Sequence, residues 1–195
     1  MKKLVLLLVI LLFSSNLIQA KEPALYPEKD YRNSFKITFL SWISGSTKIS
    51  YERAFNNIRQ SGEFCTSLIG AGRDKYNNDP KGFTMRYGHK FFMNENQKKS
   101  LMGFYLRPEI VYSHYSYNRQ ADGMRTMAKS TAFLGTLGYQ YVHKRFLADF
   151  WVGGGYAAGT PAETYYHHGF ELWHFFNSVN TDVALSFSIR LGYCF

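Results

Sequence analysis

The last segment of the chain alternates apolar side chains with small or polar ones. From Val183 to Phe195 the odd positions are apolar or aromatic, whereas the even positions carry Ala, Ser, Arg, Gly and Cys. Because successive side chains of a strand point to opposite faces, this segment predicts a strand with one apolar and one polar face. Strands of soluble domains are usually shorter, and about 9–11 tilted residues are enough to cross a bilayer. The pattern therefore favours a membrane-spanning strand.

Seven further segments are expected to form strands, most of them with the same alternation. Their expected bounds are about 35–42, 47–55, 64–72, 82–92, 101–115, 131–141 and 146–156. The longer connections then lie at the end opposite the termini, notably Ser116–Lys129 and Ala157–Asp182. The connection at 43–46 lies at the same end but is short. Short periplasmic turns, longer outer loops and an even number of strands are typical of outer-membrane barrels. The expected fold is all-β, an eight-stranded antiparallel up-and-down transmembrane β-barrel closed by pairing of 183–195 with 35–42.

Charged residues occupy the polar face of these expected strands. An Arg or Lys that faces lipid at mid-membrane costs about 2–4 kcal/mol. The interior of an eight-stranded barrel, in contrast, is just wide enough for side chains to fill it. We therefore expect a polar interior filled by paired charges, and not an open aqueous pore. The residues expected inside are Lys36, Lys48, Glu52, Arg86, Arg107, Glu109, Asp149 and Arg190.

Proline and cysteine positions add local expectations. Pro108 has no N–H to donate, so a bulge or break is expected in the strand that contains it. The only cysteines, Cys65 and Cys194, are expected near the periplasmic rim on strands that are not neighbours. A disulfide is compatible with an oxidising periplasm, but two small hydrophobic thiols are the preferred interpretation.

The start of the chain has the pattern of a secretory signal peptide. Lys2 and Lys3 precede an apolar run that ends at Phe13, and the small residue Ala20 follows a polar stretch. The run is too short for a spanning helix, which needs roughly 20 apolar residues. We expect residues 1–20 to be removed on export and residues 21–195 to form a single outer-membrane barrel domain.

Composition narrows the possible partners. The formal net charge is +9, and the chain contains 15 Tyr and 17 Phe. Basic charge is compatible with lipid or lipopolysaccharide headgroups, and equally with solvated loops. The run Gly153–Gly155 lacks the strand–turn–helix context and the Lys-Ser or Lys-Thr of a nucleotide loop, and nothing resembles a nucleic-acid motif. No cofactor, metal or nucleic acid is expected.

The closing segment resembles the C-terminal signal that outer-membrane barrels present to their assembly machinery. The residues that carry this resemblance are Phe187, Leu191, Tyr193 and Phe195. Residues 48–55 and 103–112 resemble small outer-membrane barrel proteins of Bacteroidetes, OmpA/OmpX-like in architecture and largely of unassigned function. The resemblance implies the fold, an outer-membrane location and insertion by the barrel assembly machinery. It implies no catalytic residues.

One pair of residues suggests a catalytic alternative. His114 and Ser116 share a face near the outer end of the expected fifth strand. This pair is similar to that of outer-membrane lipid A deacylases, in which His is the base and Ser the nucleophile. Such a triad also needs an acid to orient the His, and no Glu lies between Glu109 and Glu163. Tyr117 also replaces the family's asparagine after the serine. An interfacial histidine among tyrosines is the preferred interpretation.

The last long connection contains a cluster of aromatic residues and histidines. Its members are Tyr165, Tyr166, His167, His168, Trp173 and His174. The spacing matches no established metal site. Three interpretations of this loop are open. It is an interaction surface exposed on a rigid scaffold, an amphipathic element on the outer leaflet, or a cap on the barrel.

The expected function is that of an integral outer-membrane barrel with a non-enzymatic structural or surface-interaction role. The first alternative is a lipid A-modifying hydrolase that uses His114 and Ser116. The second is a soluble secreted barrel that binds a small apolar ligand.

Deletion of Phe195 is predicted to impair insertion, because it removes the final aromatic residue of the assembly pattern. The measurement is the fraction of protein that shows heat-modifiable migration on gels. Unchanged heat-modifiable migration in the deletion variant would contradict this role.

Overall fold

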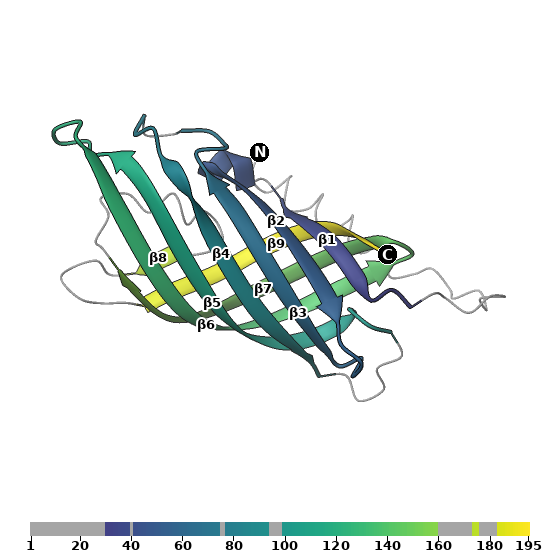
Figure 1. Cartoon of the computed structure of the whole chain (residues 1–195). Coiled ribbons are helices and arrows are strands. Elements are labelled where there is room, and N and C mark those ends of the chain that lie inside the picture. Colours follow the sequence, from purple (N-terminus) through teal and green to yellow (C-terminus); the bar gives the residue numbers. More distant parts are fainter. Residues whose placement is uncertain (1–29, 40, 75–76, 94–98, 160–172, 176–182) are drawn as a thin grey trace, which may run out of the picture.

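The computed structural model of the chain is an all-β barrel (Figure 1). It describes residues 30–39, 41–74, 77–93, 99–159, 173–175 and 183–195, so the expected signal peptide lies outside the described residues. The elements are β1 (Asn33–Thr38), a 3-10 helix η1 (Ser41–Ser44), β2 (Ser46–Ala54), β3 (Gln60–Ile69), β4 (Lys81–Phe92), β5 (Gly103–Asn118), β6 (Arg125–His143), β7 (Phe146–Gly159), β8 (Trp173–Phe175) and β9 (Val183–Cys194). Among the described residues no helix has the length and hydropathy needed to cross a membrane.

Eight of the strands close into a barrel. Each strand pairs antiparallel with its neighbour in the order β1 to β7, then β9, and β9 pairs back with β1. The predicted eight-stranded antiparallel up-and-down barrel and the predicted closing pair are therefore confirmed. We call the end where β1 begins and β9 ends the terminal end, and the opposite end the far end.

The register of the strands fixes the tilt of the barrel. Starting at Ala148 in β7, the paired positions lead through Leu191 and Ile37, around the barrel, and back to β7 at Ala158. The path is displaced by ten residues along β7, which is the shear of the barrel. With a rise of about 3.3 Å per residue and strands about 4.8 Å apart, this shear corresponds to a tilt of roughly 40°. An eight-stranded barrel of this kind has room for side chains only.

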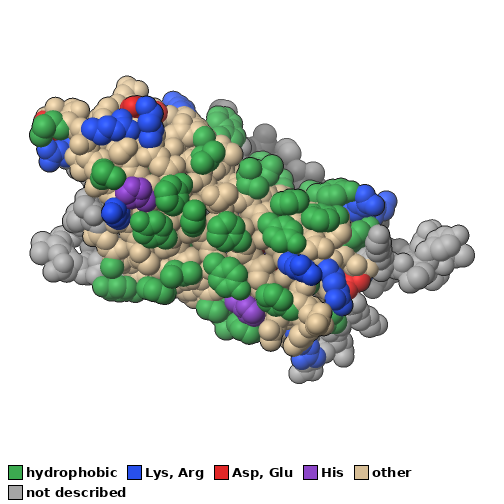
Figure 2. Space-filling view, viewed as in Figure 1, with side chains coloured by type: hydrophobic (Ala, Val, Ile, Leu, Met, Phe, Trp, Pro, Cys, Tyr) green, Lys and Arg blue, Asp and Glu red, His purple; other side chains and the backbone are tan. Residues whose placement is uncertain are grey.

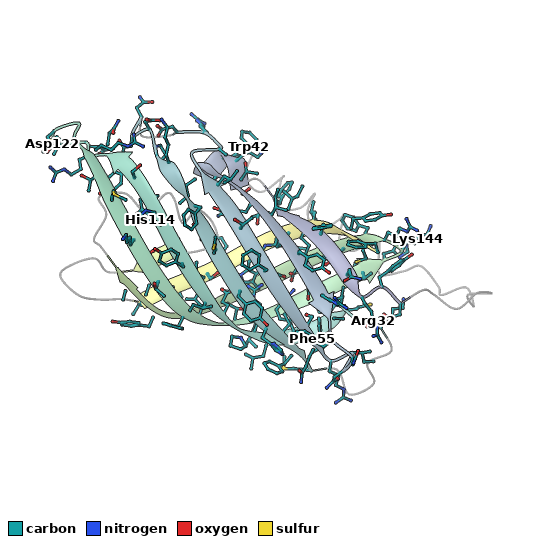
Figure 3. The ribbon with its side chains drawn as sticks, in the orientation of Figure 1. Arg32, Trp42, Phe55, His114, Asp122 and Lys144 are labelled. Carbon is teal, nitrogen blue, oxygen red and sulfur yellow. The ribbon has the colours of Figure 1, made fainter. Side chains whose placement is uncertain are left out.

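The two faces of the wall differ in polarity. Along β9 the burial alternates strictly from Val183 to Arg190, with the apolar residues exposed and the small or charged ones buried. Across the described strands and turns, thirty-two large hydrophobic side chains are exposed, whereas ten Lys, Arg, Asp and Glu side chains are buried. Figure 2 shows hydrophobic side chains over the middle of one outer face and basic side chains toward its two ends. Figure 3 shows Trp42 and Asp122 at the far end, and Arg32, Phe55 and Lys144 toward the terminal end.

Several strand bounds differ from those expected. β1 ends at Thr38, because η1 and the turn at Gly45, whose φ is 85°, replace the expected end of this strand. β5 and β6 continue as a paired hairpin to Asn118 and Arg125, so the loop expected over Ser116–Lys129 was wrong. The reason is that the alternation of buried and exposed side chains persists along β5 to Asn118.

β3 begins earlier, at Gln60, and places Cys65 in mid-strand and not near the rim. Both cysteines are thiols.

Three local features have physical causes. Strand β8 was not expected, and it pairs with Val183–Leu185, a part of the β9 edge that the short β1 does not reach. The break expected at Pro108 is present on the β4 side, where pairing stops after Glu109 and resumes at Leu106 without a change of register. A Cβ atom at Gly153 would lie 2.2 Å from a backbone oxygen of β6, so glycine relieves crowding between these strands.

Candidate functional site: an ionic layer across the barrel

A layer of buried polar side chains crosses the barrel in its terminal half. Every strand of the closed barrel contributes to it. From β1 through β7 and then β9, its members are Lys36, Glu52, Glu63, Lys90, Arg107, Gln140, Asp149 and Arg190. None of them is more than 2% exposed. We call these eight residues the ionic layer.

Glu63 is the centre of the ionic layer, because it contacts four cationic groups. Its Oε2 contacts the Nζ atoms of Lys36 and, at 3.1 Å, of Lys90. Its Oε1 accepts hydrogen bonds from the guanidinium groups of Arg190 and, at 3.4 Å, of Arg107. A charge in a low-dielectric interior is stable only when it is paired and hydrogen-bonded. Glu63 meets this condition through both of its oxygens.

The other two carboxylates of the layer are also fully paired. Asp149 Oδ2 accepts hydrogen bonds from Lys36 at 2.9 Å and from Lys90 at 2.7 Å, and its Oδ1 accepts one from the Tyr105 hydroxyl at 2.6 Å. Glu52 Oε2 accepts from Lys36 at 2.6 Å and from the Gln140 amide at 3.1 Å, and its Oε1 accepts from Ser61. Hydrogen bonds to every oxygen of these two carboxylates stiffen the interior around them.

The two arginines of the layer contact the ring of Trp151, and a glycine leaves space for one of them. The guanidinium carbons of Arg107 and Arg190 lie 4.3 and 4.4 Å from the ring centroid of Trp151, within the range of cation–π contacts. A Cβ atom at Gly88 would lie 2.6 Å from the side chain of Arg107. Glycine at this inward position therefore gives Arg107 the space to extend across the barrel.

All eight charged residues that the sequence places inside the barrel are buried there. Five of them belong to the ionic layer. Lys48, Arg86 and Glu109 lie further toward the far end, where Glu109 is 2.9 Å from Arg107 and 3.7 Å from Arg86. Sequence reasoning missed Glu63, because the expected third strand began after it. Lys90 was also missed, although it shares its inward parity with Arg86 in β4.

The three acidic groups of the layer have the spacing of a metal site. Carboxylate oxygens of Glu52, Glu63 and Asp149 all lie within 4.8 Å of one another. However, Lys36 and Lys90 contact all three carboxylates. A divalent cation would have to displace both ammonium groups. The arrangement therefore neutralises charge within the protein and does not present a vacant set of ligands.

No hydrogen bond joins His114 and Ser116 in the ranges that the structure describes. The Ser116 hydroxyl accepts hydrogen bonds from Arg125 at 2.7 and 3.2 Å. His114 Nδ1 has no hydrogen-bond partner in the described part of the chain, and the residue opposite His114 on β6 is Lys129. The acid that orients the His of a triad is not at this paired position. The ring of His114 instead lies 6.0 Å from that of Phe83.

Other predicted residues lie on the outer surface or outside the described residues. Phe187, Leu191, Tyr193 and Phe195 all point outward from the last strand, and the ring of Phe195 stacks on that of Phe35. From the candidate loop surface, Trp173 and His174 are described only as backbone of β8. The positions outside the described residues are Tyr165, Tyr166, His167 and His168.

Ion pairs at the far end are exposed and local. Asp79 contacts Lys81 and Arg125, both at 3.0 Å. Hydrogen bonds from these two bases hold the pKa of Asp79 below its ordinary value. The backbone N–H of Met124, together with Arg119, likewise lowers the pKa of Asp122. Three bases at this end, Lys81, Arg119 and Arg125, are thus paired with acids.

Comparisons of the chain with protein-family models, with curated proteins and with solved structures give no match. The architecture and the ionic layer are therefore the basis for any functional conclusion.

Substitution of Glu63 by Gln is predicted to destabilise the barrel by about 3–5 kcal/mol, because four buried cationic groups lose a shared carboxylate. The measurement is urea unfolding of the refolded protein followed by tryptophan fluorescence. The matched control is Asp79→Asn, whose ion pairs are exposed and whose loss should leave the unfolding midpoint nearly unchanged. Equal midpoints for wild type and Glu63→Gln would show that the ionic layer is not a structural centre.

Proposed function

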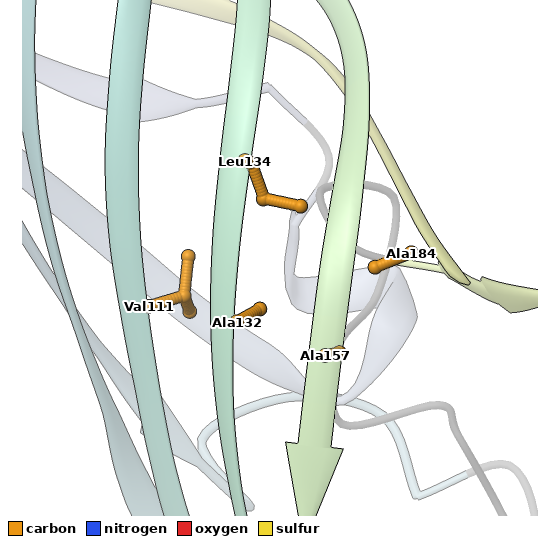
Figure 4. Close-up of a cluster of buried hydrophobic side chains, with 5 residues drawn as sticks. All are labelled: Val111, Ala132, Leu134, Ala157 and Ala184. Atoms are coloured by element: carbon orange, nitrogen blue, oxygen red, sulfur yellow. The ribbon is translucent and has the colours of Figure 1, made fainter. Parts of the chain in front are cut away.

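We propose that this protein is an integral outer-membrane β-barrel with a non-enzymatic structural or surface-interaction role and no open pore. The observation that carries the proposal is the inverted polarity of the wall. Apolar side chains cover its outside, whereas all the buried charges lie inside. The inside also holds small clusters of apolar and aromatic side chains, one of which, around Leu134, is shown in Figure 4. A soluble barrel would place the apolar face inward, since burial of apolar surface drives its folding. Exposed apolar patches of this size mark protein or membrane contacts.

The height of the apolar surface supports a membrane setting. On β5 the outward side chains from Phe104 to Tyr112 are apolar or aromatic, or proline at position 108. This stretch matches the roughly 9–11 tilted residues that cross a bilayer. Beyond it lie His114 and, opposite on β6, Lys129, which suit the headgroup region.

Aromatic rings gather at the terminal end of the apolar surface. The Phe35 ring lies 5.3 Å from that of Tyr51 and 5.4 Å from that of Phe195, and the Phe104 ring lies 4.6 Å from that of Tyr139. Amphipathic rings are enriched at membrane boundaries, and barrels carry girdles of them. These rings support an orientation with the terminal end at one interface.

The interior supports a closed and not a conducting barrel. Eight side chains of the ionic layer, one from each strand, are nearly inaccessible to water. The Ser116 hydroxyl is bound by the cationic Arg125, which favours the non-enzymatic role over the hydrolase. The expected partners are outer-membrane lipid, lipopolysaccharide and the barrel assembly machinery. Likeness to the small barrels of Bacteroidetes is part of the same proposal.

Substitution of Ile110 by Arg tests the membrane setting. Ile110 is 42% exposed at the middle of β5. In a bilayer the substitution should destabilise the barrel by about 2–4 kcal/mol, because it faces a charge toward lipid. In a soluble barrel an exposed Ile→Arg change costs little. The measurement is unfolding in liposomes, together with fractionation of a Gram-negative host that expresses the chain. Recovery of the wild type as a soluble periplasmic protein would refute the proposal.

A further inference from the structure

Four basic residues form an arc along the terminal end of the barrel. They are Arg32, Arg53, Lys144 and Arg145, and all four are exposed. None of them forms an ion pair with another residue in the described ranges of the chain, in contrast to the acid-matched bases of the far end. Among the residues that the structure describes, Asp30 is the acidic residue next to the arc in the chain, so bases are in excess there. We call these four residues the basic arc.

Strand pairing makes the basic arc continuous. Asn33 lies opposite Arg53 on β2, and the carbonyl of Arg32 accepts a hydrogen bond from the Ala54 N–H at 2.8 Å. On its other side, Asn33 exchanges backbone hydrogen bonds with Phe195 at 2.9 and 3.2 Å. The carbonyl of Arg145 accepts the N–H of Cys194, which precedes Phe195. The arc therefore extends from the β6–β7 turn across β9 and β1 to β2.

An aromatic surface adjoins the basic arc. The ring of Phe35 on β1 contacts that of Tyr51 on β2 and that of Phe195, the residue after β9. Arg145 donates a hydrogen bond to the Tyr193 hydroxyl, and its guanidinium lies 5.6 Å from the centre of that ring. The acidic groups near the arc are partly engaged, because both Asp30 oxygens accept hydrogen bonds from Ser100, at 2.7 and 2.9 Å. Apolar rings and adjacent cations thus share one surface.

We propose that the basic arc binds the phosphodiester group of an anionic phospholipid, with the acyl chains on the adjacent Phe35–Tyr51–Phe195 surface. Adjacent like charges repel, and an anion between them removes the repulsion. Guanidinium groups match phosphate oxygens through paired N–H donors. The aromatic rings select a ligand with an apolar body over a free phosphate ion. This inference rests on the proposed membrane location and names the lipid class at one interface.

The test is native mass spectrometry of the full barrel in detergent, offered equal amounts of phosphatidylglycerol and phosphatidylcholine with the same acyl chains. We expect phosphatidylglycerol to be retained about tenfold better, because charge-assisted hydrogen bonds are worth roughly 1.5–3 kcal/mol. The double variant Arg32→Gln, Arg53→Gln should lose this preference. The matched control is Arg119→Gln, Arg125→Gln at the far end, where both bases have acidic partners, and it should keep the preference.

Three results would overturn the lipid assignment. They are equal retention of the two lipids, an equal loss in both double variants, and full displacement of phosphatidylglycerol by inorganic phosphate at matched ionic strength. Heat-modifiable migration of each variant shows that the barrel is folded. A barrel that fractionates with membranes but shows no lipid preference refutes only this inference. A barrel recovered as a soluble periplasmic protein refutes the proposed function as well.

Discussion

The rest of the barrel depends on the pairing of the Glu63 carboxylate with the buried cations of the interior. Two lysines and two arginines from four other strands meet at this carboxylate. Each of these cations would be costly to bury alone, and the barrel has no space to let them reach water. The network therefore links β1, β3, β4, β5 and β9 across the lumen and not along the wall. Backbone hydrogen bonds between strands close the barrel, and the ion pairs of this layer hold its interior side chains in place.

The polarity of the wall follows from the same constraint. A shear of ten residues over eight strands leaves an interior wide enough only for side chains, and here ten of these are charged. Apolar residues of the opposite parity must then point outward, where Phe133 and Val152 are 59% and 63% exposed. Exposed apolar surface on this scale is costly in water. The proposed bilayer removes that cost, and the basic arc and aromatic rings suit its boundary.

Alternation of side chains along the sequence predicts most of the fold and five residues of the ionic layer, but not the centre of that layer. The β9 pattern predicts the closing strand because each of its side chains faces either the interior or the outside. It cannot predict that β1 stops at Thr38, since the turn geometry at Gly45 decides this. It also cannot place Glu63 at the centre of the charges. That position depends on how the register brings side chains from distant strands to the same level, which no local pattern contains.

Quenching of tryptophan fluorescence by lipids with brominated acyl chains tests the account most directly. Two variants would each keep one tryptophan, either the inward-facing Trp151 or a new one at Leu106→Trp, with Phe at the remaining native Trp positions. The account predicts strong quenching at position 106 and little quenching at Trp151, because only the first faces acyl chains. Strong quenching of Trp151, or none at position 106, would contradict a barrel with lipid outside and charges inside.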